Sequence, residues 1–300
     1  QQELLNIVIV GGGATGIEVA GILSEMKKFV LPNDYPDMPS SLMHIYLIEA
    51  GPRLLAGMSE ESSAHAEQFL REMGVNILLN KRVVDYRDHK VVLEDGTEIA
   101  TRTFIWVSGV TGVTIGNMDP SLIGRGGRIK VDSFNRVEGM SNVFAIGDQC
   151  IQVADENYPN GHPQLAQVAI QQGELLAKNL IRMEKGREMK PFHYRNLGSM
   201  ATVGRNRAVA EFSKVKMQGW FAWVMWLVVH LRSILGVRNK VIVLLNWVWN
   251  YFTYDQSMRM IVYARKAKEI RDREKLEETT HWGKEQVQEE KDLSITSSSK

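Results

Sequence analysis

Three glycines in this sequence have a spacing suited to binding phosphate groups. Gly11, Gly13 and Gly16 form the pattern G-x-G-x-x-G, directly after the apolar run 4–10 and before the helical pattern 17–29. In a strand–turn–helix unit, the first glycine permits the tight turn and the second lets a pyrophosphate approach the backbone. The third lets the helix pack closely on the strand. Free N–H groups at the helix N-terminus then stabilise the phosphates, so the pattern predicts a dinucleotide site.

An acidic residue follows the next predicted strand. His44–Ile48 reads as that strand, and Glu49 stands at its end. A carboxylate there accepts hydrogen bonds from both ribose hydroxyls and repels a 2′-phosphate, which favours NADH over NADPH. The interval from Gly16 to Glu49 is long, and we expect the proline-rich stretch 30–41 to form a surface loop that accounts for it. The alternative is a glycine-rich turn without a ligand.

Glu18 lies in the first turn of the predicted helix. An acid at this position can simply complement the helix dipole. It can also lie beside the nicotinamide, where it would affect nucleotide binding or proton movement. The spacing does not separate these two interpretations.

The order of the predicted elements indicates an α/β fold. Strand, glycine turn, helix, strand, helix and strand form the doubly wound, Rossmann-like pattern. The further predicted elements are a helix over about 59–73, a meander that turns at 88–90, and strands over 75–79, 103–107 and 143–146. We expect an NADH-binding domain over 1–115 and the C-terminal part of an FAD-binding domain over 116–212. Membrane-associated helices over 213–265 and a charged, disordered tail over 266–300 complete the predicted organisation.

Composition excludes several classes of protein. The 36 lysines and arginines nearly balance the 35 acidic residues, and the net charge of +1 argues against a nucleic-acid partner. The single cysteine, Cys150, excludes a disulfide framework and a dense thiolate metal site within the chain, and we expect no metal. It also argues against disulfide reductases and sulfide:quinone enzymes, which need paired cysteines. The first residue is Gln1 and no signal peptide precedes the first strand, so we expect a fragment cut at a domain edge.

Several segments together resemble a known family. Besides the glycine turn, with Glu18, they are the segments 49–55 (EAGPRLL), 106–110 (WVSGV), 145–148 (AIGD) and 166–173 (AQVAIQQG). Over roughly residues 4–265 the sequence is similar to the two-dinucleotide flavoproteins, and within them to the type II (alternative) NADH:quinone oxidoreductases. The segment 166–173 resembles the quinone-site helix of that class.

The resemblance implies FAD as a second cofactor. It places Gly147 and Asp148 at the flavin, with the ribityl chain against the aspartate, and adds Gly109 as a cofactor contact. The family's N-terminal FAD-binding segment, with its own glycine turn, has no counterpart in this sequence. We therefore expect the chain by itself to bind FAD poorly and to be inactive. A helix beginning near Pro163–Leu165 would point its N-terminus, at Leu165, toward the isoalloxazine and stabilise negative charge on the reduced flavin.

Two glutamines on that predicted helix are candidates for contacting a quinone. Gln167 and Gln171 are four residues apart and share one helix face, while Gln172 does not. We predict that Gln167 and Gln171 bind the quinone carbonyls. A polar stripe on an ordinary helix is the alternative.

The region after residue 218 suggests contact with a membrane surface. The stretches 219–231 and 241–254 carry no charge, are rich in tryptophan and are flanked by cations. Each is too short to cross about 30 Å of hydrocarbon. Amphipathic helices lying in the headgroup region fit this pattern best. A homodimer interface of the same composition and a kinked transmembrane hairpin are the alternatives.

These observations predict an enzyme that transfers hydride from NADH to FAD and two electrons onward to a membrane quinone, without pumping protons. We expect a peripheral protein on the cytoplasmic face of a bacterial inner membrane. One alternative is a soluble flavin reductase of a protein acceptor, such as a ferredoxin or rubredoxin reductase. Another is a non-enzymatic, membrane-associated scaffold that binds nucleotides.

Overall fold

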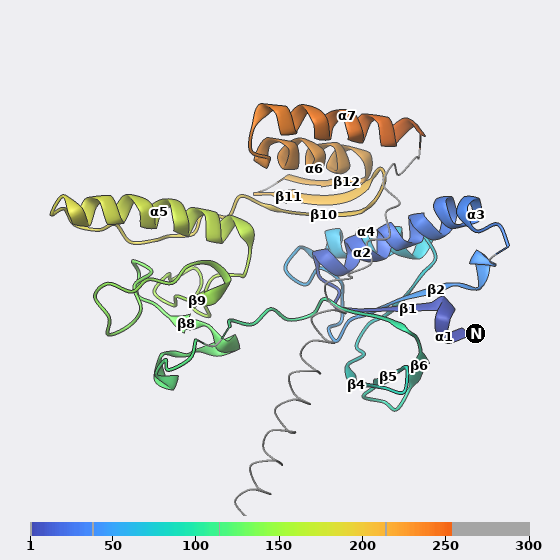
Figure 1. Cartoon of the computed structure of the whole chain (residues 1–300), viewed down its shortest axis with the longest axis horizontal. Coiled ribbons are helices and arrows are strands. Elements are labelled where there is room, and N and C mark those ends of the chain that lie inside the picture. The colour runs from blue at the N-terminus through green and yellow to red at the C-terminus, as the bar shows by residue number, and fades with distance from the viewer. Residues whose placement is uncertain (1, 38, 114, 214, 254–300) are drawn as a thin grey trace, which may run out of the picture. The chain divides into compact units, whose positions relative to one another are not determined.

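A computed structural model describes residues 2–37, 39–113, 115–213 and 215–253 of the chain (Figure 1). The chain divides into two compact units, 1–243 and 244–300, which are treated separately. Only residues 244–253 of the second unit are described, so the tail predicted over 266–300 lies outside the described residues.

The first unit is built on a four-stranded parallel sheet in the order β3-β2-β1-β7. The strands are β1 (Asn6–Val10), β2 (His44–Ile48), β3 (Val75–Leu78) and β7 (Thr103–Trp106). Residues of β1 alternate between two hydrophobic clusters because successive side chains of a strand point to opposite faces. Ile7 and Ile9 pack toward α2 (Ala14–Glu25) and α4 (Glu60–Glu72), whereas Val8 and Val10 pack toward the opposite face. This arrangement confirms the predicted α/β fold with a parallel sheet, although helices cover only one face of that sheet.

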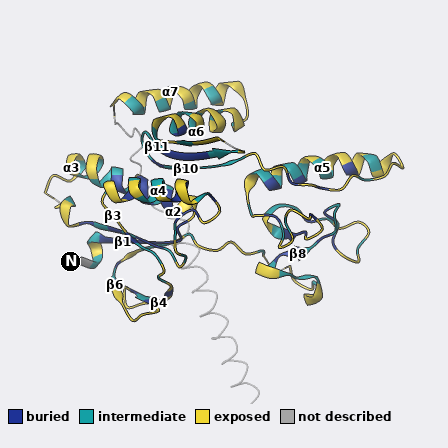
Figure 2. Ribbon diagram, turned by 180° about the vertical axis from the view of Figure 1, so that it is seen from behind, coloured by how far each residue is buried: buried dark blue, intermediate teal, exposed yellow. Residues whose placement is uncertain are grey.

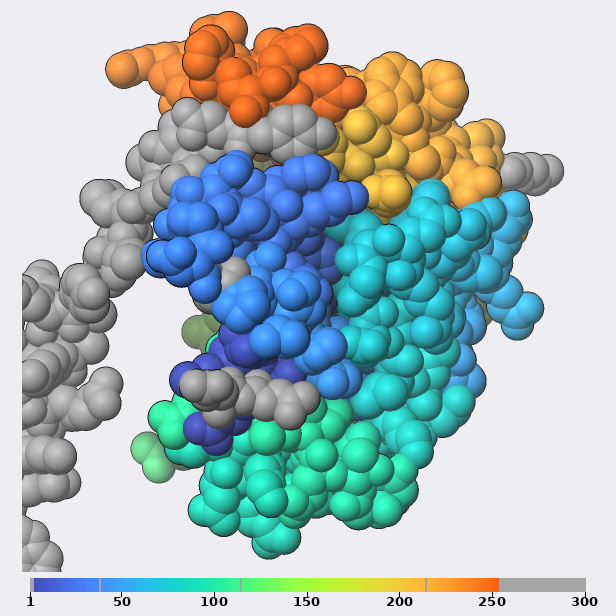
Figure 3. Space-filling view, turned by 90° about the vertical axis from the view of Figure 1, so that its right-hand side faces the viewer, coloured from blue at the N-terminus to red at the C-terminus, as the bar shows by residue number. Residues whose placement is uncertain are grey.

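The opposite face is covered by an antiparallel three-stranded meander. Its strands are β4 (Val83–Arg87), β5 (Lys90–Leu93) and β6 (Glu98–Ala100). Val83, Val91 and Ile99 contribute the buried side chains that meet Val8 and Val10. In Figure 3 the N-terminal residues (dark blue) lie between the helical layer (blue) and the meander (cyan to green).

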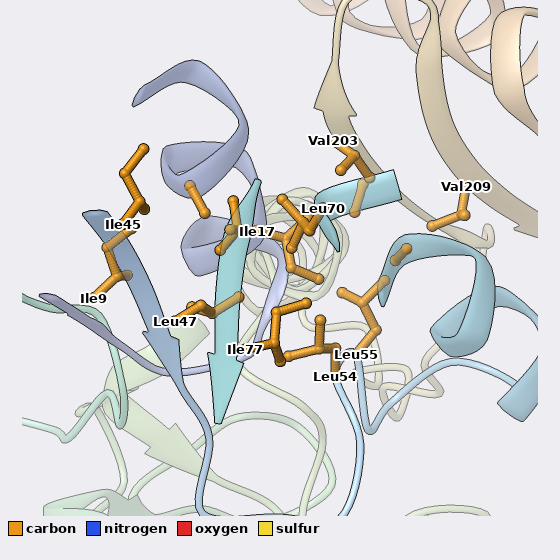
Figure 4. Close-up of a cluster of buried hydrophobic side chains, with 14 of the residues drawn as sticks. Ile9, Ile17, Ile45, Leu47, Leu54, Leu55, Leu70, Ile77, Val203 and Val209 are labelled. Carbon is orange, nitrogen blue, oxygen red and sulfur yellow. The ribbon is translucent and has the colours of Figure 1, made fainter. Parts of the chain in front are cut away.

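A second sheet completes the helical side of the same core. It contains β10 (Ser199–Gly204), β11 (Arg207–Phe212) and β12 (Val215–Gln218), all antiparallel. Ala201, Val203 and Val209 are fully buried in the cluster that also holds Ile9 and Ile17. Figure 4 shows side chains from both sheets and from α2 and α4 converging there. This sheet continues to Gln218, beyond the domain boundary predicted at residue 212.

The segment between the two sheets has its own small core. Ile129, Val131, Val137, Ala145 and Cys150 form its buried cluster. Its regular elements are η3 (Pro120–Leu122), η4 (Arg125–Gly127), β8 (Ile129–Lys130), η5 (Gly147–Gln149), β9 (Cys150–Ile151) and the long helix α5 (Ala166–Glu184).

The chain continues into two helices after β12. They are α6 (Gly219–Ser233) and α7 (Val237–Thr253). Most apolar side chains of α7 are exposed, whereas those of α6 are divided between exposed and half-buried positions (Figure 2). Among the described residues, no helix combines the length and the apolar character needed to cross a bilayer.

Four local predictions need correction. The first strand starts at Asn6 because residues 2–5 form the short helix α1 (Gln2–Leu5). The predicted loop 30–41 is partly helical: α2 runs on through η1 (Met26–Val30) into α3 (Leu31–Asp34), and η2 (Ser40–Leu42) follows. Pro32 is compatible with this helix because it stands in the first turn, where no N–H partner is needed.

The other two corrections concern strands. The predicted strand 143–146 forms only one bridge, between Phe144 and Arg136, because no second strand pairs with it among the described residues. Strand 103–107 ends at Trp106 and is not fully buried, since β7 lies at the edge of the sheet and the Trp106 side chain is 56% exposed.

Candidate functional site

The glycine turn has the geometry that its sequence predicts. Gly11 adopts φ +119°, a conformation that side chains strongly disfavour. A Cβ on Gly16 would lie 1.8 Å from the carbonyl oxygen of Gly11, so only glycine allows α2 to start this close to β1. A Cβ on Gly13 would meet nothing within 4 Å, which leaves the backbone there open to a ligand.

The N-terminus of α2 is free to bind an anion. Gly13 is the N-cap residue and provides no side-chain cap. The first helical hydrogen bond runs from the Ile17 N–H to the Gly13 carbonyl oxygen at 3.1 Å. The N–H groups of residues 14–16 therefore lack helical acceptors and, with the helix dipole, favour a phosphate.

Glu49 is held rigidly next to this turn. Its Oε2 accepts a hydrogen bond from the Gly12 N–H at 2.6 Å, and its Oε1 accepts one from the Gly51 N–H at 2.7 Å. Each carboxylate oxygen has a further lone pair for a ribose hydroxyl. The predicted ribose-binding acid is thus positioned at the end of β2 by the turn it is expected to serve.

Glu18 was predicted in the first turn of the helix, but α2 already begins at Ala14, so Glu18 lies beyond that turn, on the face that meets β10. Its Oε1 accepts a hydrogen bond from the Thr202 N–H at 3.4 Å. Glu25, two turns further on, accepts one from the Arg205 N–H at 2.5 Å. Gly21 lies between them, and a Cβ there would be 1.9 Å from the Val203 carbonyl oxygen. Glu18 therefore helps attach α2 to the second sheet, a contact that neither sequence interpretation anticipated.

Gly147 and Asp148 form the tight turn before β9. Gly147 adopts φ +65°, and its N–H donates to Oε1 of the buried Gln172 at 2.6 Å. The Asp148 side chain is exposed, while its carbonyl oxygen accepts a hydrogen bond from Gln164 at 3.2 Å. Burial raises the pKa of the Cys150 thiol beneath this turn, an effect that Arg128 partly offsets. Gln172 thus supports the Gly-Asp turn and does not point to solvent.

The two predicted quinone ligands share one helix face, but their amides already bind backbone groups. Gln167 donates to the Gly198 carbonyl at 3.0 Å and accepts from the Leu197 N–H at 3.1 Å. Gln171 donates to the Arg195 carbonyl at 3.0 Å and accepts from the Arg195 N–H at 3.1 Å. Each amide retains one hydrogen and one lone pair for another partner.

The remaining predicted contacts are exposed. Gly109 follows β7 with φ +75°, and a Cβ there would meet nothing within 4 Å. Leu165 is the N-cap residue of α5, has no side-chain cap and is 41% exposed. The N-terminus of α5 therefore has no side-chain cap, and its contact with a flavin stays a prediction.

A buried pair next to α5 was missed by sequence reasoning. His162 Nε2 lies 3.0 Å from Asp155 Oδ2, and both side chains are almost fully buried among Tyr158, Phe192 and Tyr194. Burial alone would raise the pKa of Asp155, but hydrogen bonds from His162 and two backbone N–H groups lower it below its ordinary value. The signal in the sequence was weak, because one histidine and one aspartate seven residues apart match no motif.

The comparisons with known proteins identify the family of this chain. Residues 1–173 match the pyridine nucleotide-disulphide oxidoreductase family, and residues 196–254 match the NDH2 C-terminal domain. The type II NADH:quinone oxidoreductase NdhA of Mycobacterium tuberculosis is 35% identical over 82% of this chain and 54% of its own length. The internal alternative NAD(P)H-ubiquinone oxidoreductase A1, mitochondrial, of Arabidopsis thaliana is 31% identical over 84% of this chain and 52% of its own length.

The solved structures support the fold. NDH2 from Plasmodium falciparum in complex with NADH superimposes with a TM-score of 0.75 at 19% identity, covering 84% of this chain and 66% of that one. The chain therefore has an α/β fold built on a parallel sheet, like the solved NDH2 structure. It belongs to the pyridine nucleotide-disulphide oxidoreductase family, and within it to the type II NADH:quinone oxidoreductase (NDH-2) family. The chain spans about half the length of the curated relatives it matches.

Proposed function

We propose that the protein containing this chain oxidises NADH through a bound FAD and reduces a membrane quinone. The observation that carries the proposal is the fixed Glu49 beside the open Gly13 and the uncapped N-terminus of α2. A pyrophosphate fits the free N–H groups, and a ribose fits the carboxylate. The fixed carboxylate disfavours a 2′-phosphate, so NADH is the preferred donor.

The residues of this chain also fit part of a flavin site. Asp148 offers an exposed carboxylate to hydroxyl groups, and the uncapped N-terminus of α5 offers N–H groups to the electron-rich edge of the ring. Bound FAD would supply hydride acceptance and two-electron transfer. Gln172 would hold the Gly147 turn in place, and Gly109 would leave room for a cofactor approaching from β7.

Glu18, Gln167 and Gln171 are proposed to act on the substrates. The second oxygen of the Glu18 carboxylate remains available for a proton or the nicotinamide amide. The free amide hydrogens of Gln167 and Gln171 would donate to quinone carbonyls while their other bonds hold the side chains in place. A substitution of either glutamine by methionine should raise the KM for quinone and leave the KM for NADH unchanged.

The exposed apolar faces of α6 and α7 support attachment to a membrane surface. Phe221 on α6 and Trp249 and Phe252 on α7 are 70%, 60% and 77% exposed. Arg232, Arg238 and Lys240 supply cations for anionic headgroups. We propose a peripheral association that brings the enzyme to a lipid-dissolved quinone, on the cytoplasmic face of a bacterial inner membrane. Flotation with anionic and neutral vesicles tests it, and a dimer in solution without vesicle binding would refute it.

The activity is tested in the complete protein, loaded with FAD. We would follow NADH oxidation with a short-chain quinone as acceptor, with NADPH as the control donor. Rapid quinone reduction from NADH and little from NADPH is expected. Oxidation of NADH with ferricyanide but not with quinone would refute the quinone assignment and favour a protein acceptor.

A further inference from the structure

Two cationic residues, Arg53 and Lys81, lie near the predicted ribose-binding acid Glu49. Arg53 follows Glu49 by four residues, and the Lys81 N–H donates to the Glu49 carbonyl oxygen at 3.1 Å. An arginine near the ribose-binding acid is the residue type that accommodates the 2′-phosphate of NADPH. The choice between the two nucleotides therefore depends on where these positive charges are directed.

The guanidinium of Arg53 is directed into its own loop. Nη1 donates to the Met58 carbonyl oxygen at 2.8 Å and more weakly to the Leu55 carbonyl oxygen at 3.4 Å. Nη2 donates to the Ala56 carbonyl oxygen at 2.9 Å. The planar guanidinium has its donors in a rigid arrangement, so binding these three carbonyls fixes its orientation. The Arg53 guanidinium thus holds the loop 53–58 together through three of the loop's own carbonyl groups.

This loop fastens the glycine turn. The Leu55 N–H donates to the Gly12 carbonyl oxygen at 2.8 Å, and Leu55 is held at φ +47°, an uncommon conformation for a leucine. The side chain of Leu54 covers Gly12, since a Cβ on Gly12 would lie 2.7 Å from Leu54 Cδ2. Figure 4 shows Leu54 and Leu55 pointing into the core beside Ile77. Holding the loop therefore holds Gly12, which in turn donates to Glu49.

The positive charge of the second cationic residue, Lys81, is neutralised by an ion pair with Asp95. The Lys81 ammonium pairs with Asp95, and this hydrogen bond, together with those from Thr97, lowers the pKa of Asp95 to about 2. The carboxylate is consequently ionised at neutral pH. Both side chains are about 40% exposed, so the pair adds little to stability, but its net charge is zero.

We propose that Arg53 is a positioning residue of the nucleotide site. It holds the loop 53–58 on the glycine turn and thereby keeps its charge away from a 2′-phosphate. This inference rests on the proposed NADH site and deepens it. Glu49 then repels the 2′-phosphate of NADPH, and no cation nearby among the described residues attracts that phosphate. Removing the Glu49 carboxylate should therefore abolish the preference for NADH without creating a preference for NADPH.

The test measures binding of ADP-ribose and of 2′-phospho-ADP-ribose to the complete protein by calorimetry. We expect Arg53→Met to weaken ADP-ribose binding roughly tenfold, the effect of about one net hydrogen bond, with the selectivity for it retained. Arg53→Lys should recover part of the affinity, because an ammonium can reach one or two of the carbonyls. The Leu55 amide should exchange its hydrogen faster in Arg53→Met. Glu49→Gln should bring the two affinities within a few-fold of each other.

Arg71→Met is the matched control, since Arg71 is exposed on α4 and, among the described residues, its ion pair is with Glu67, at 2.7 Å. It should change neither affinity. If Arg53→Met in the Glu49→Gln background removes affinity for 2′-phospho-ADP-ribose alone, Arg53 is a phosphate ligand and the proposal is wrong. A lower Tm with unchanged affinities would also overturn it. Failure of the unmodified protein to bind ADP-ribose would instead refute the NADH site itself.

Discussion

The contact between α2 and β10 provides a direct test of how the two sheets are joined. Gly21 is the point of closest approach, and a Cβ there would lie 1.9 Å from the Val203 carbonyl oxygen and 2.6 Å from the Val203 carbonyl carbon. Both are backbone atoms of β10, at the irregularity between Thr202 and Gly204, so no side-chain rotation relieves the clash. We therefore consider Gly21→Ala, the smallest change that adds a Cβ.

The magnitude follows from the displacement. An ordinary carbon–oxygen contact is somewhat above 3 Å, so α2 and β10 would have to separate by more than about 1 Å. Overpacking costs roughly 1–3 kcal/mol, and a backbone clash belongs at the upper end. The separation also weakens the hydrogen bonds from Thr202 to Glu18 and from Arg205 to Glu25, each worth about 1 kcal/mol. We expect a loss of about 3–4 kcal/mol, or roughly 10 °C in Tm for a domain of this size.

The loss of stability in Gly21→Ala is measured as a change in Tm, with thermal unfolding monitored by circular dichroism. Gly13→Ala is the matched control. A Cβ on Gly13 meets nothing within 4 Å, and its φ of −75° suits alanine. Gly13→Ala should leave the Tm within about 2 °C of the unmodified protein but weaken nucleotide binding. A Gly21→Ala protein with an unchanged Tm would refute the argument that this contact holds the sheets together.

Three further predictions concern buried polar groups. Glu211→Gln should lower the Tm by several degrees at neutral pH, because Glu211 accepts hydrogen bonds from the Ser59 N–H and hydroxyl at the start of α4. These bonds lower the pKa of Glu211, although burial opposes the shift. The Tm difference between the two proteins should therefore be largest above about pH 4.5, the ordinary pKa of a glutamate, and should shrink as the pH falls further. A Tm difference that does not change with pH would contradict this. Asp155→Ala should lower the free energy of unfolding, measured in urea, by about 3 kcal/mol. The change leaves His162 Nε2 and the N–H groups of Asn157 and Tyr194 without their acceptor. A loss below about 1 kcal/mol would show that water replaces the carboxylate. Cys150 should resist iodoacetamide at about pH 8 in the folded protein and react after unfolding, because burial raises the pKa of its thiol. Mass spectrometry measures the labelling. Rapid labelling of the folded protein would mean that the Gly147 turn opens readily.

The nucleotide half of the fold was predictable because its signals are local. The glycine spacing, the alternating apolar residues and the acid at the strand end each depend on neighbours within a few residues. The predicted α4 helix is confirmed with Ser59 as its N-cap, as the serine and the following acids indicate. The turn between β4 and β5 is also confirmed, although Asp88 and His89 both take positive φ without a glycine.

The features that sequence reasoning missed involve partners that are distant in the sequence. The i,i+4 spacing placed Gln167 and Gln171 on one face, but nothing local indicates that residues 195–198 cover that face. The segment 143–146 has strand-like residues, yet a strand also needs a partner, and here it has a single bridge. Arg53 binds backbone carbonyls, which any sequence offers equally, so its role leaves no pattern to recognise.

The two family models match separate ranges of the chain, but residues from both ranges pack in one hydrophobic core. The match to the NDH2 C-terminal domain starts at residue 196, after the first match has ended at 173. Yet Ala201, Val203 and Val209 are buried with Ile9 and Ile17, and Glu211 binds the N-cap of α4. Without β10 and β11, these apolar faces of α2 and α4 would be exposed to water, at a cost of about 25 cal/mol for each Å². The C-terminal segment therefore completes the core of the nucleotide-binding part, and the helix that presents Gly13 to a ligand depends on residues nearly two hundred positions later in the chain.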